Sequence, residues 1–350
     1  MLAAIRRWFD DNILELGREM RLSYLPPLMV YVAAGVSGLT GIVGTFFVKE
    51  YLGLSAAFLA ALGFWAGIPW ALKMPLGHLV DLIWRHKAGL VWLGATLIAA
   101  SLLIMLGLVA EPRYMGGIMS LEAWFVLSAM LSPVGYVLQD VVADAMTVEA
   151  VPRVNDRGEM LPSEARRLMN TTLQTLGRVA IIGGGVLVSL VNVLMFQGVE
   201  SLPNAERIAI YALVYGMALV IPAISVAGVL LASLIRRREV GRLRAHGFDE
   251  TSLRAILEPP PDAVKPDWWI LGGSLVFVAI SVSVGVSQLE FGQEIIFLAS
   301  FAVITFLMAK LLRELDEDSR RTLLGTAIVI FVFRAMPGPG VGSTWWMIDI

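Results

Sequence analysis

Residues Leu121 to Glu149 read LEAWFVLSAMLSPVGYVLQDVVADAMTVE, a run long enough to cross a bilayer as one helix. Its second half carries Asp140 and Asp144, and carboxylates inside an apolar span are costly unless they face a partner or a water-filled cavity. Four residues apart, the two side chains share one face of a helix. Gln139 lies one position away from that face. The run therefore predicts polar or charged partners elsewhere in the chain.

The composition indicates an all-α, polytopic membrane protein. Of the 350 residues, 57% are hydrophobic and 16% charged, and the mean hydropathy is +0.74. The chain has no cysteine, and its three histidines show no metal-ligand spacing. No glycine-rich phosphate loop follows a strand-like segment. We expect no metal, no cofactor, no enzymatic activity and no nucleic-acid partner.

Hydropathy predicts about nine membrane spans. They cover residues 25–48, 54–80, 88–109, 121–149, 165–196, 207–235, 268–288, 292–312 and 322–347. The sequence before them places Leu2, Ile5, Trp8, Phe9 and Leu16 at helical spacing among charges. Residues 1–24 are therefore expected to contain an interfacial helix lying on the membrane.

Lys and Arg residues concentrate in alternate connections, and the positive-inside rule places those connections in the cytoplasm. If the N-terminus is cytoplasmic, that side receives the cluster Arg236, Arg237, Arg238, Arg242 and Arg244. The opposite side receives only Lys49, Arg113 and Arg207. We therefore expect a protein of the bacterial inner (plasma) membrane with a cytoplasmic N-terminus.

The pattern divides the chain after its interfacial helix into four further parts. Residues 25–236 would form a six-helix transmembrane bundle, and 237–267 a charged cytoplasmic linker ending in three prolines. Residues 268–312 would form two inserted helices that lack buried charge, as an antiparallel pair outside the bundle. Residues 313–350 would hold one more helix, in which Arg334 precedes the break Pro337-Gly338-Pro339-Gly340.

Polar and small residues mark the faces expected to meet neighbours. Asn170, Gln174 and Arg178 follow one another at i, i+4 and i+8, which predicts a polar stripe lining a cavity. Glycines at 35, 38, 41 and 44, and the pair Gly63 and Gly67, predict close helix packing.

The charges expected inside the membrane are Lys73, Asp140, Asp144, Arg178 and Arg334, with Glu149 at the edge. One interpretation is a cavity in which the basic groups attract an anionic solute and an aspartate takes part in proton coupling or conformational switching. The other is a set of structural ion pairs. An aspartyl intramembrane protease is disfavoured because both aspartates lie on one helix, a full turn apart.

Three segments carry a resemblance to a known family. They are IPWALKMPLGHLVD at residues 68–81, LQDVVADAMTVEA at 138–150 and NTTLQTLGRVAIIGGG at 170–185. Together they resemble the folate–biopterin transporters of the major facilitator superfamily, and FRAMPGPG at 333–340 looks like the seventh helix of that family.

The resemblance implies a secondary transporter for a small organic anion, folate- or pterin-like, with possible proton symport. It places Trp70, Lys73, Gln174 and Arg334 on the family's pattern as substrate-binding candidates, and we add Arg178 from the polar stripe. It puts Asp140 and Asp144 on the same pattern, and we take these two residues, together with Asp81 and Glu149, as candidates for coupling or gating. It also implies a second six-helix bundle, of which only the first helix is present. We expect a fragment of a protein of about fourteen helices, although a partner chain or a loss of transport would also fit.

Two functions of different classes stay open. The chain could be such a transporter, or a transporter-shaped membrane scaffold or assembly factor without transport activity. Charges at mid-depth in the membrane favour the first, because a scaffold gains nothing from burying them. Lys73 and Asp140 lie at similar distances from the cytoplasmic side, where an unpaired charge costs about 2.5–3.5 kcal/mol. We therefore expect Lys73 to pair with Asp140 or Asp144, leaving Arg178 freer for a solute.

Overall fold

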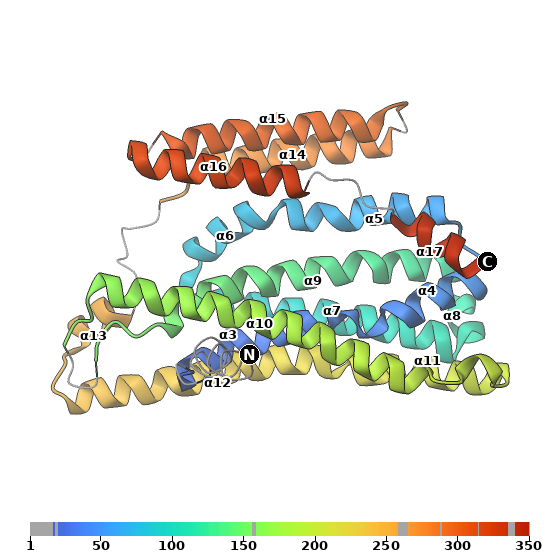
Figure 1. Ribbon diagram of the computed structural model, residues 1–350, viewed down its shortest axis with the longest axis horizontal. Helices are drawn as coiled ribbons and strands as arrows, with labels where there is room; N and C mark the ends of the chain where they lie inside the picture. The colour runs from blue at the N-terminus through green and yellow to red at the C-terminus, as the bar shows by residue number, and fades with distance from the viewer. Residues whose placement is uncertain are drawn as a thin grey trace, which may run out of the picture. The chain divides into compact units, whose positions relative to one another are not determined.

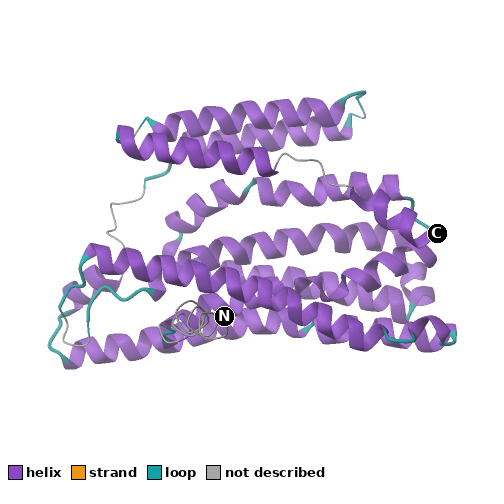
Figure 2. Ribbon diagram, viewed as in Figure 1, coloured by secondary structure: helices purple, strands orange, loops and turns teal. Residues whose placement is uncertain are grey.

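The computed structural model describes residues 17, 20–155, 159–257, 265–287, 289–313, 315–334 and 340–349. Within these ranges the chain is helical with short connections and no strand, apart from one isolated bridge between Val154 and Met160 (Figure 2). Seven helical segments there are long and apolar enough to cross a membrane. The chain is thus a polytopic membrane protein, while the number of about nine spans stays a prediction.

The contacts divide the chain into two units. The first comprises the described parts of Met1–Ser55 and Ala61–Val264, and the second those of Ala56–Ala60 and Lys265–Ile350. The expected interfacial helix lies almost entirely outside the described residues, as does the Pro337–Pro339 break.

The first unit is built from long helices joined by short turns (Figure 1). Its α-helices are α3 (Leu25–Gly35), α4 (Gly41–Glu50), α5 (Ala56–Ala71, whose first turn belongs to the second unit), α6 (Lys73–Leu82), α7 (Lys87–Ala110), α8 (Pro112–Ile118), α9 (Leu121–Ala150), α10 (Ser163–Phe196), α11 (Asn204–Ala218), α12 (Val220–Ala245) and α13 (Glu250–Leu257). Its 3-10 turns are η2 (Leu22–Tyr24), η3 (Val36–Thr40), η4 (Trp84–His86) and η5 (Val199–Ser201).

Three spans that hydropathy predicts as continuous are interrupted. The first changes from α3 to the 3-10 turn η3 within its glycine-rich stretch. The second breaks at Leu72, between Pro69 and Pro75, whose missing N–H groups remove two helical hydrogen bonds. Leu72 N instead donates to Pro69 O over 3.1 Å, in the tighter i→i−3 pattern. The sixth span breaks at Leu219, three residues before Pro222.

The helix α12 does not end near residue 235, as hydropathy predicts, but continues to Ala245. Its end is packed: Leu243 is buried in a small cluster with Val154 from the α9–α10 connection and Leu253 from α13. Part of the segment expected to be a charged linker is therefore folded against the end of α12 and the α9–α10 connection, because it supplies apolar residues at helical spacing.

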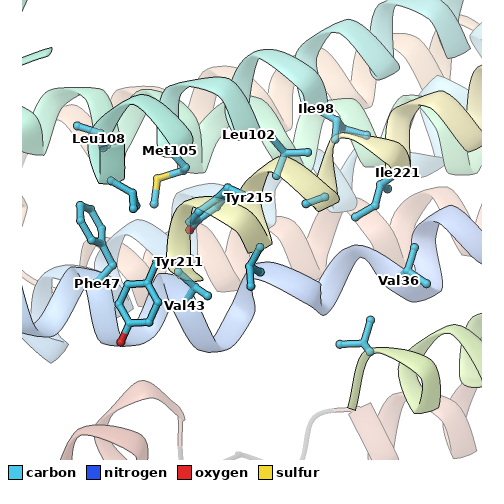
Figure 3. Packing of buried hydrophobic residues seen from close by; sticks show 14 of the residues in the cluster. Val36, Val43, Phe47, Ile98, Leu102, Met105, Leu108, Tyr211, Tyr215 and Ile221 are labelled. Atoms are coloured by element: carbon cyan, nitrogen blue, oxygen red, sulfur yellow. The ribbon is translucent and has the colours of Figure 1, made fainter. Parts of the chain in front are cut away.

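The core of the first unit lies between α4, α7 and α11, where Phe47, Leu108 and Tyr215 are among the buried residues (Figure 3). Glycines allow the closest crossings. A Cβ on Gly94 of α7 would lie 2.6 Å from Gly135 O of α9, and a Cβ on Gly35 of α3 would lie 2.5 Å from Ile181 O of α10. Backbones this close exclude any larger side chain.

The close packing expected at Gly63 and Gly67 is not found: a Cβ on either would meet no described atom within 4 Å. Spacing alone predicted that pair, but both glycines lie on a face of α5 without a described neighbour.

The second unit contains α14 (Trp268–Val286), α15 (Gly292–Leu312), α16 (Glu317–Arg334) and α17 (Gly340–Asp349). The first two pack as an antiparallel pair, because Trp269 near the start of α14 contacts Phe306 near the end of α15, with ring centroids 5.8 Å apart. Lys310 Nζ lies 4.1 Å from the centroid of the Trp269 ring. The two helices are therefore antiparallel, whereas their place outside a six-helix bundle stays a prediction.

Candidate functional site

A lysine and two carboxylates meet where α6 begins and α9 crosses it. Lys73 Nζ lies 2.5 Å from Asp140 Oδ2 and 2.9 Å from Asp144 Oδ2. The i, i+4 spacing puts both carboxylates on one face of α9, and the break at Leu72 makes Lys73 the first residue of α6. The expected pairing is confirmed, and it involves both aspartates. These three residues are called the charge triad below.

The charge triad is partly open. The side chain of Asp140 is 15% exposed, whereas those of Lys73 and Asp144 are each 43% exposed. A fully enclosed ion pair would be fixed in place, but groups exposed to this degree can exchange partners with a solute or a proton.

Tyr31 of α3 completes the site, and the sequence analysis missed it. Its Oη donates a 2.7 Å hydrogen bond to Asp144 Oδ1, and its ring lies against Gly177 of α10, where a Cβ would come within 2.9 Å of the ring. Only 5% of Tyr31 is exposed. A phenol in an apolar span normally finds a hydrogen-bond partner, which was the signal available.

Helix α10 reaches the site through its polar stripe. Gln174 Nε2 donates to Thr147 Oγ1 over 3.2 Å, and Thr147 Oγ1 in turn donates to Asp144 O over 2.7 Å. Arg178 is exposed and interacts electrostatically with Tyr31. Among the described residues, Arg178 has no carboxylate within ion-pair distance. The structure thus brings together α3, α6, α9 and α10 around Asp144.

The other candidates form no hydrogen bond or ion pair with the charge triad in the part of the chain that the structure describes. Trp70, on the last turn of α5, is 46% exposed, and Asp81, on the last turn of α6, is exposed and interacts electrostatically with His78. Arg334 is the last residue of α16 in the second unit, and its side chain lies outside the described part of the chain.

Glu149 belongs to a second charged group, at the end of α9. Lys87 Nζ at the start of α7 lies 2.6 Å from Glu149 Oε1, and Arg236 of α12 approaches the same oxygen at 4.0 Å. Lys87 is buried, and its ammonium also lies 3.8 Å from the centroid of the Trp84 ring. This group connects three helices at one end of the bundle. The sequence analysis did not pair Lys87 with Glu149.

The charge balance of the triad determines its chemistry. One ammonium faces two carboxylates, so the ionised triad carries one excess negative charge in a membrane span. Uptake of one proton would neutralise it, and the Tyr31 hydroxyl already supplies a hydrogen bond to one of the two carboxylates. No group of three metal-ligating side chains occurs in the described part of the chain.

Comparison with known proteins gives one informative similarity. Over 153 residues the chain is 28% identical to a folate-biopterin transporter of Synechocystis sp., and the aligned part covers 43% of this chain. It covers only 28% of that protein's length. No protein-family model matches the chain, and no solved structure matches it. Together with the apolar helices, the similarity supports an integral membrane protein of the transporter kind.

Proposed function

We propose that the chain forms the substrate-handling part of a secondary transporter of the major facilitator type that moves a small organic anion, folate- or pterin-like, together with protons. The observation that carries the proposal is the charge triad, held in a membrane span at a helix break. A scaffold gains nothing from half-exposed charges at this depth, whereas a transporter needs groups that change partners.

In this mechanism the triad is the coupling site. With both aspartates ionised, Lys73 is held by two carboxylates. Protonation of Asp144 would leave Lys73 bound to Asp140 alone and reduce its attachment to α9. The α6 segment begins at Lys73 and is separated from α5 by the Leu72 break, so it can move with that change. Proton binding would thereby change the packing of α6 on α9.

The anion would bind beside the triad. Arg178 has no carboxylate within ion-pair distance in the described residues, interacts electrostatically with Tyr31, and shares a helix face with Gln174. A guanidinium binds a carboxylate in bidentate fashion, and an exposed Trp70 offers a flat surface for a pterin-like ring. Arg334 joins this group only through the family resemblance.

Gating is assigned to the second charged group. The ion pair between Glu149 and Lys87 connects the end of α9 to the start of α7, and Asp81 lies on the last turn of the neighbouring α6. Opening of this end would require the Glu149 contacts to break. Ion pairs at a helix end are suited to form and break in turn, because the released Glu149 and Lys87 side chains become solvated.

Direct binding tests the proposal. The purified full chain would be titrated with folate and with pterin, and tryptophan fluorescence would report binding. Arg178→Gln should weaken folate binding at least tenfold, because a charge-assisted contact is worth about 1.5–3 kcal/mol. Arg167→Gln, eleven residues earlier on α10, removes the same charge and should leave binding unchanged. Equal affinities for all three proteins, or no binding by any, would contradict the proposal and favour the scaffold.

A further inference from the structure

The cytoplasmic end of α12 carries a concentration of positive charge beyond what orientation in the membrane requires. Five of the nine residues from 236 to 244 are arginines. Three of them, Arg236, Arg237 and Arg244, lie with Ser233 and Val240 beside a shallow, open hollow on the surface of α12, which is called the groove below. These positions form one face of the helix, since they follow at spacings of three and four.

The neighbouring acidic groups neutralise this face unevenly. Arg244 is paired with Glu250 of α13, and Arg236 lies 4.0 Å from a Glu149 oxygen that Lys87 already binds at 2.6 Å. Arg237 has no acidic partner within the described ranges. The groove therefore holds a net positive charge, centred on Arg237, that is available to an anion.

Depth places the groove at the membrane surface. The apolar run of α12 ends at Ile235, so Arg236 and Arg237 lie about 2–3 Å beyond it along the helix. The polar layer of one leaflet is about 5–7 Å thick, which puts both guanidinium groups at the level of lipid phosphates. One to two turns towards the membrane, Leu234 and Leu230 are 53% and 50% exposed on the adjoining surface. An anion bound here would have acyl chains beside exposed leucines.

We infer that this groove binds the headgroup of an anionic phospholipid, with the phosphate held by Arg237 and Arg236 and the acyl chains against Leu230 and Leu234. The inference does not rest on the proposed transport reaction, although Arg236 also approaches Glu149 of the second charged group. It would attach the end of α12 to the cytoplasmic leaflet, where basic clusters near a membrane helix attract anionic lipids.

The experiment compares two adjacent arginines. The full chain would be purified with phosphatidylglycerol or phosphatidylcholine of equal chain length, and native mass spectrometry would report lipid retention. The wild type should retain phosphatidylglycerol preferentially. Arg237→Gln should lower that preference about fivefold, as expected for one basic residue near the surface. Arg238→Gln, an exposed neighbour outside the groove, should leave it unchanged.

A second variant should bind more lipid than the wild type. Glu250→Gln frees Arg244 and should raise retention of phosphatidylglycerol, which no folding defect would mimic. Equal losses for Arg237→Gln and Arg238→Gln would overturn the inference, because they would indicate diffuse attraction rather than a site. Displacement of the lipid by millimolar inorganic phosphate would also overturn it, because a free anion would then be the ligand.

Discussion

Helix α9 meets its neighbours with two different kinds of polar contact. Towards α7, Ser128 and Ser101 exchange hydrogen bonds in which each hydroxyl lies 2.9–3.0 Å from the other residue's carbonyl, and both side chains are buried. Towards α6 and α3, the contacts of Asp140 and Asp144 are charged and partly exposed. Neutral, enclosed pairs fix a helix crossing, whereas half-open charges can respond to a proton or an anion.

The backbone shows the same difference. The α7 crossing is so close that Gly94 and Gly135 leave no room for a side chain, and α7 and α9 run side by side along much of their length (Figure 1). The α6 side instead begins at a helix break. We propose that α7 and α9 form the rigid part of the first unit and that α6 is the part that moves.

The largest effect is expected from Gly135→Ala. The new Cβ would lie 2.7 Å from Gly94 O and equally close to the Ile98 side chain, so the two helices must separate. Overpacking of this kind costs about 1–3 kcal/mol, and the backbone contact puts the cost at the upper end. Thermal unfolding in detergent should show a strongly lowered Tm. Gly67→Ala is the matched control: it has open space and should be neutral or slightly stabilising. Equal destabilisation would contradict the assignment of the rigid crossing.

Lys73→Gln should destabilise the protein by about 1–3 kcal/mol, less than a fully buried pair because the lysine is 43% exposed. It leaves two neighbouring carboxylates without their cation. Adding Asp140→Asn should restore much of the loss, since it removes the repulsion. Unfolding in detergent at neutral pH measures both variants. If the double variant is as unstable as the sum of the single variants, the residues do not interact as a triad.

Gln139→Leu tests the buried contacts of α9 with α7 and α12, and a smaller loss of stability is expected from it. Gln139 Oε1 accepts a 2.9 Å hydrogen bond from Ser225 Oγ of α12, and its Nε2 donates to Val91 O of α7. Loss of the amide leaves the Ser225 hydroxyl unsatisfied, at a cost of about 1–2 kcal/mol. Ser225→Ala should recover part of this in the double variant. Denaturation would measure the free energy of unfolding of the wild type, the two single variants and the double variant. If the losses of the single variants simply add in the double variant, the hydrogen bond between Ser225 and Gln139 does not contribute to stability.

Tyr31→Phe should have the smallest effect on stability. It removes only the hydrogen bond to Asp144 and keeps the ring against Gly177. Hydrogen bonds between membrane helices contribute about 0.6 kcal/mol on average, so the Tm should barely change. Proton-driven uptake should fall nevertheless, because the phenol holds the Asp144 carboxylate in its orientation towards Lys73. Unchanged uptake would remove Tyr31 from the site.

The sequence predicted the membrane helices and the pairing of Lys73, because both follow from hydropathy and from depth along a helix. It did not predict the breaks at Leu72 and Leu219, since hydropathy averages over the local effects of Pro75 and Pro222. The sequence analysis predicted close packing at Gly35, which the structure shows, but it also chose Gly63 and Gly67 and missed Gly94 and Gly135. Spacing alone does not show which face of a helix meets another helix.

Within the site, Asp140, Asp144 and Gln174 were recognised as polar residues in an apolar setting. Tyr31 was not, since a tyrosine is common in membrane helices and only tertiary packing brings its hydroxyl to Asp144. The pairing of Lys87 with Glu149 was missed for the same reason: the two residues are 62 positions apart.

The central claim is that Asp144 couples proton movement to transport. Its most direct test measures folate transport by proteoliposomes that contain the full chain, first as accumulation driven by a proton gradient and then as exchange across the membrane. Asp144→Asn should abolish accumulation driven by a proton gradient while preserving exchange of labelled for unlabelled folate, because the substrate site persists and only proton coupling is lost. Glu122→Gln, at the start of α9, removes the same charge and should behave like the wild type. Proton-driven accumulation that survives Asp144→Asn unchanged would contradict the account.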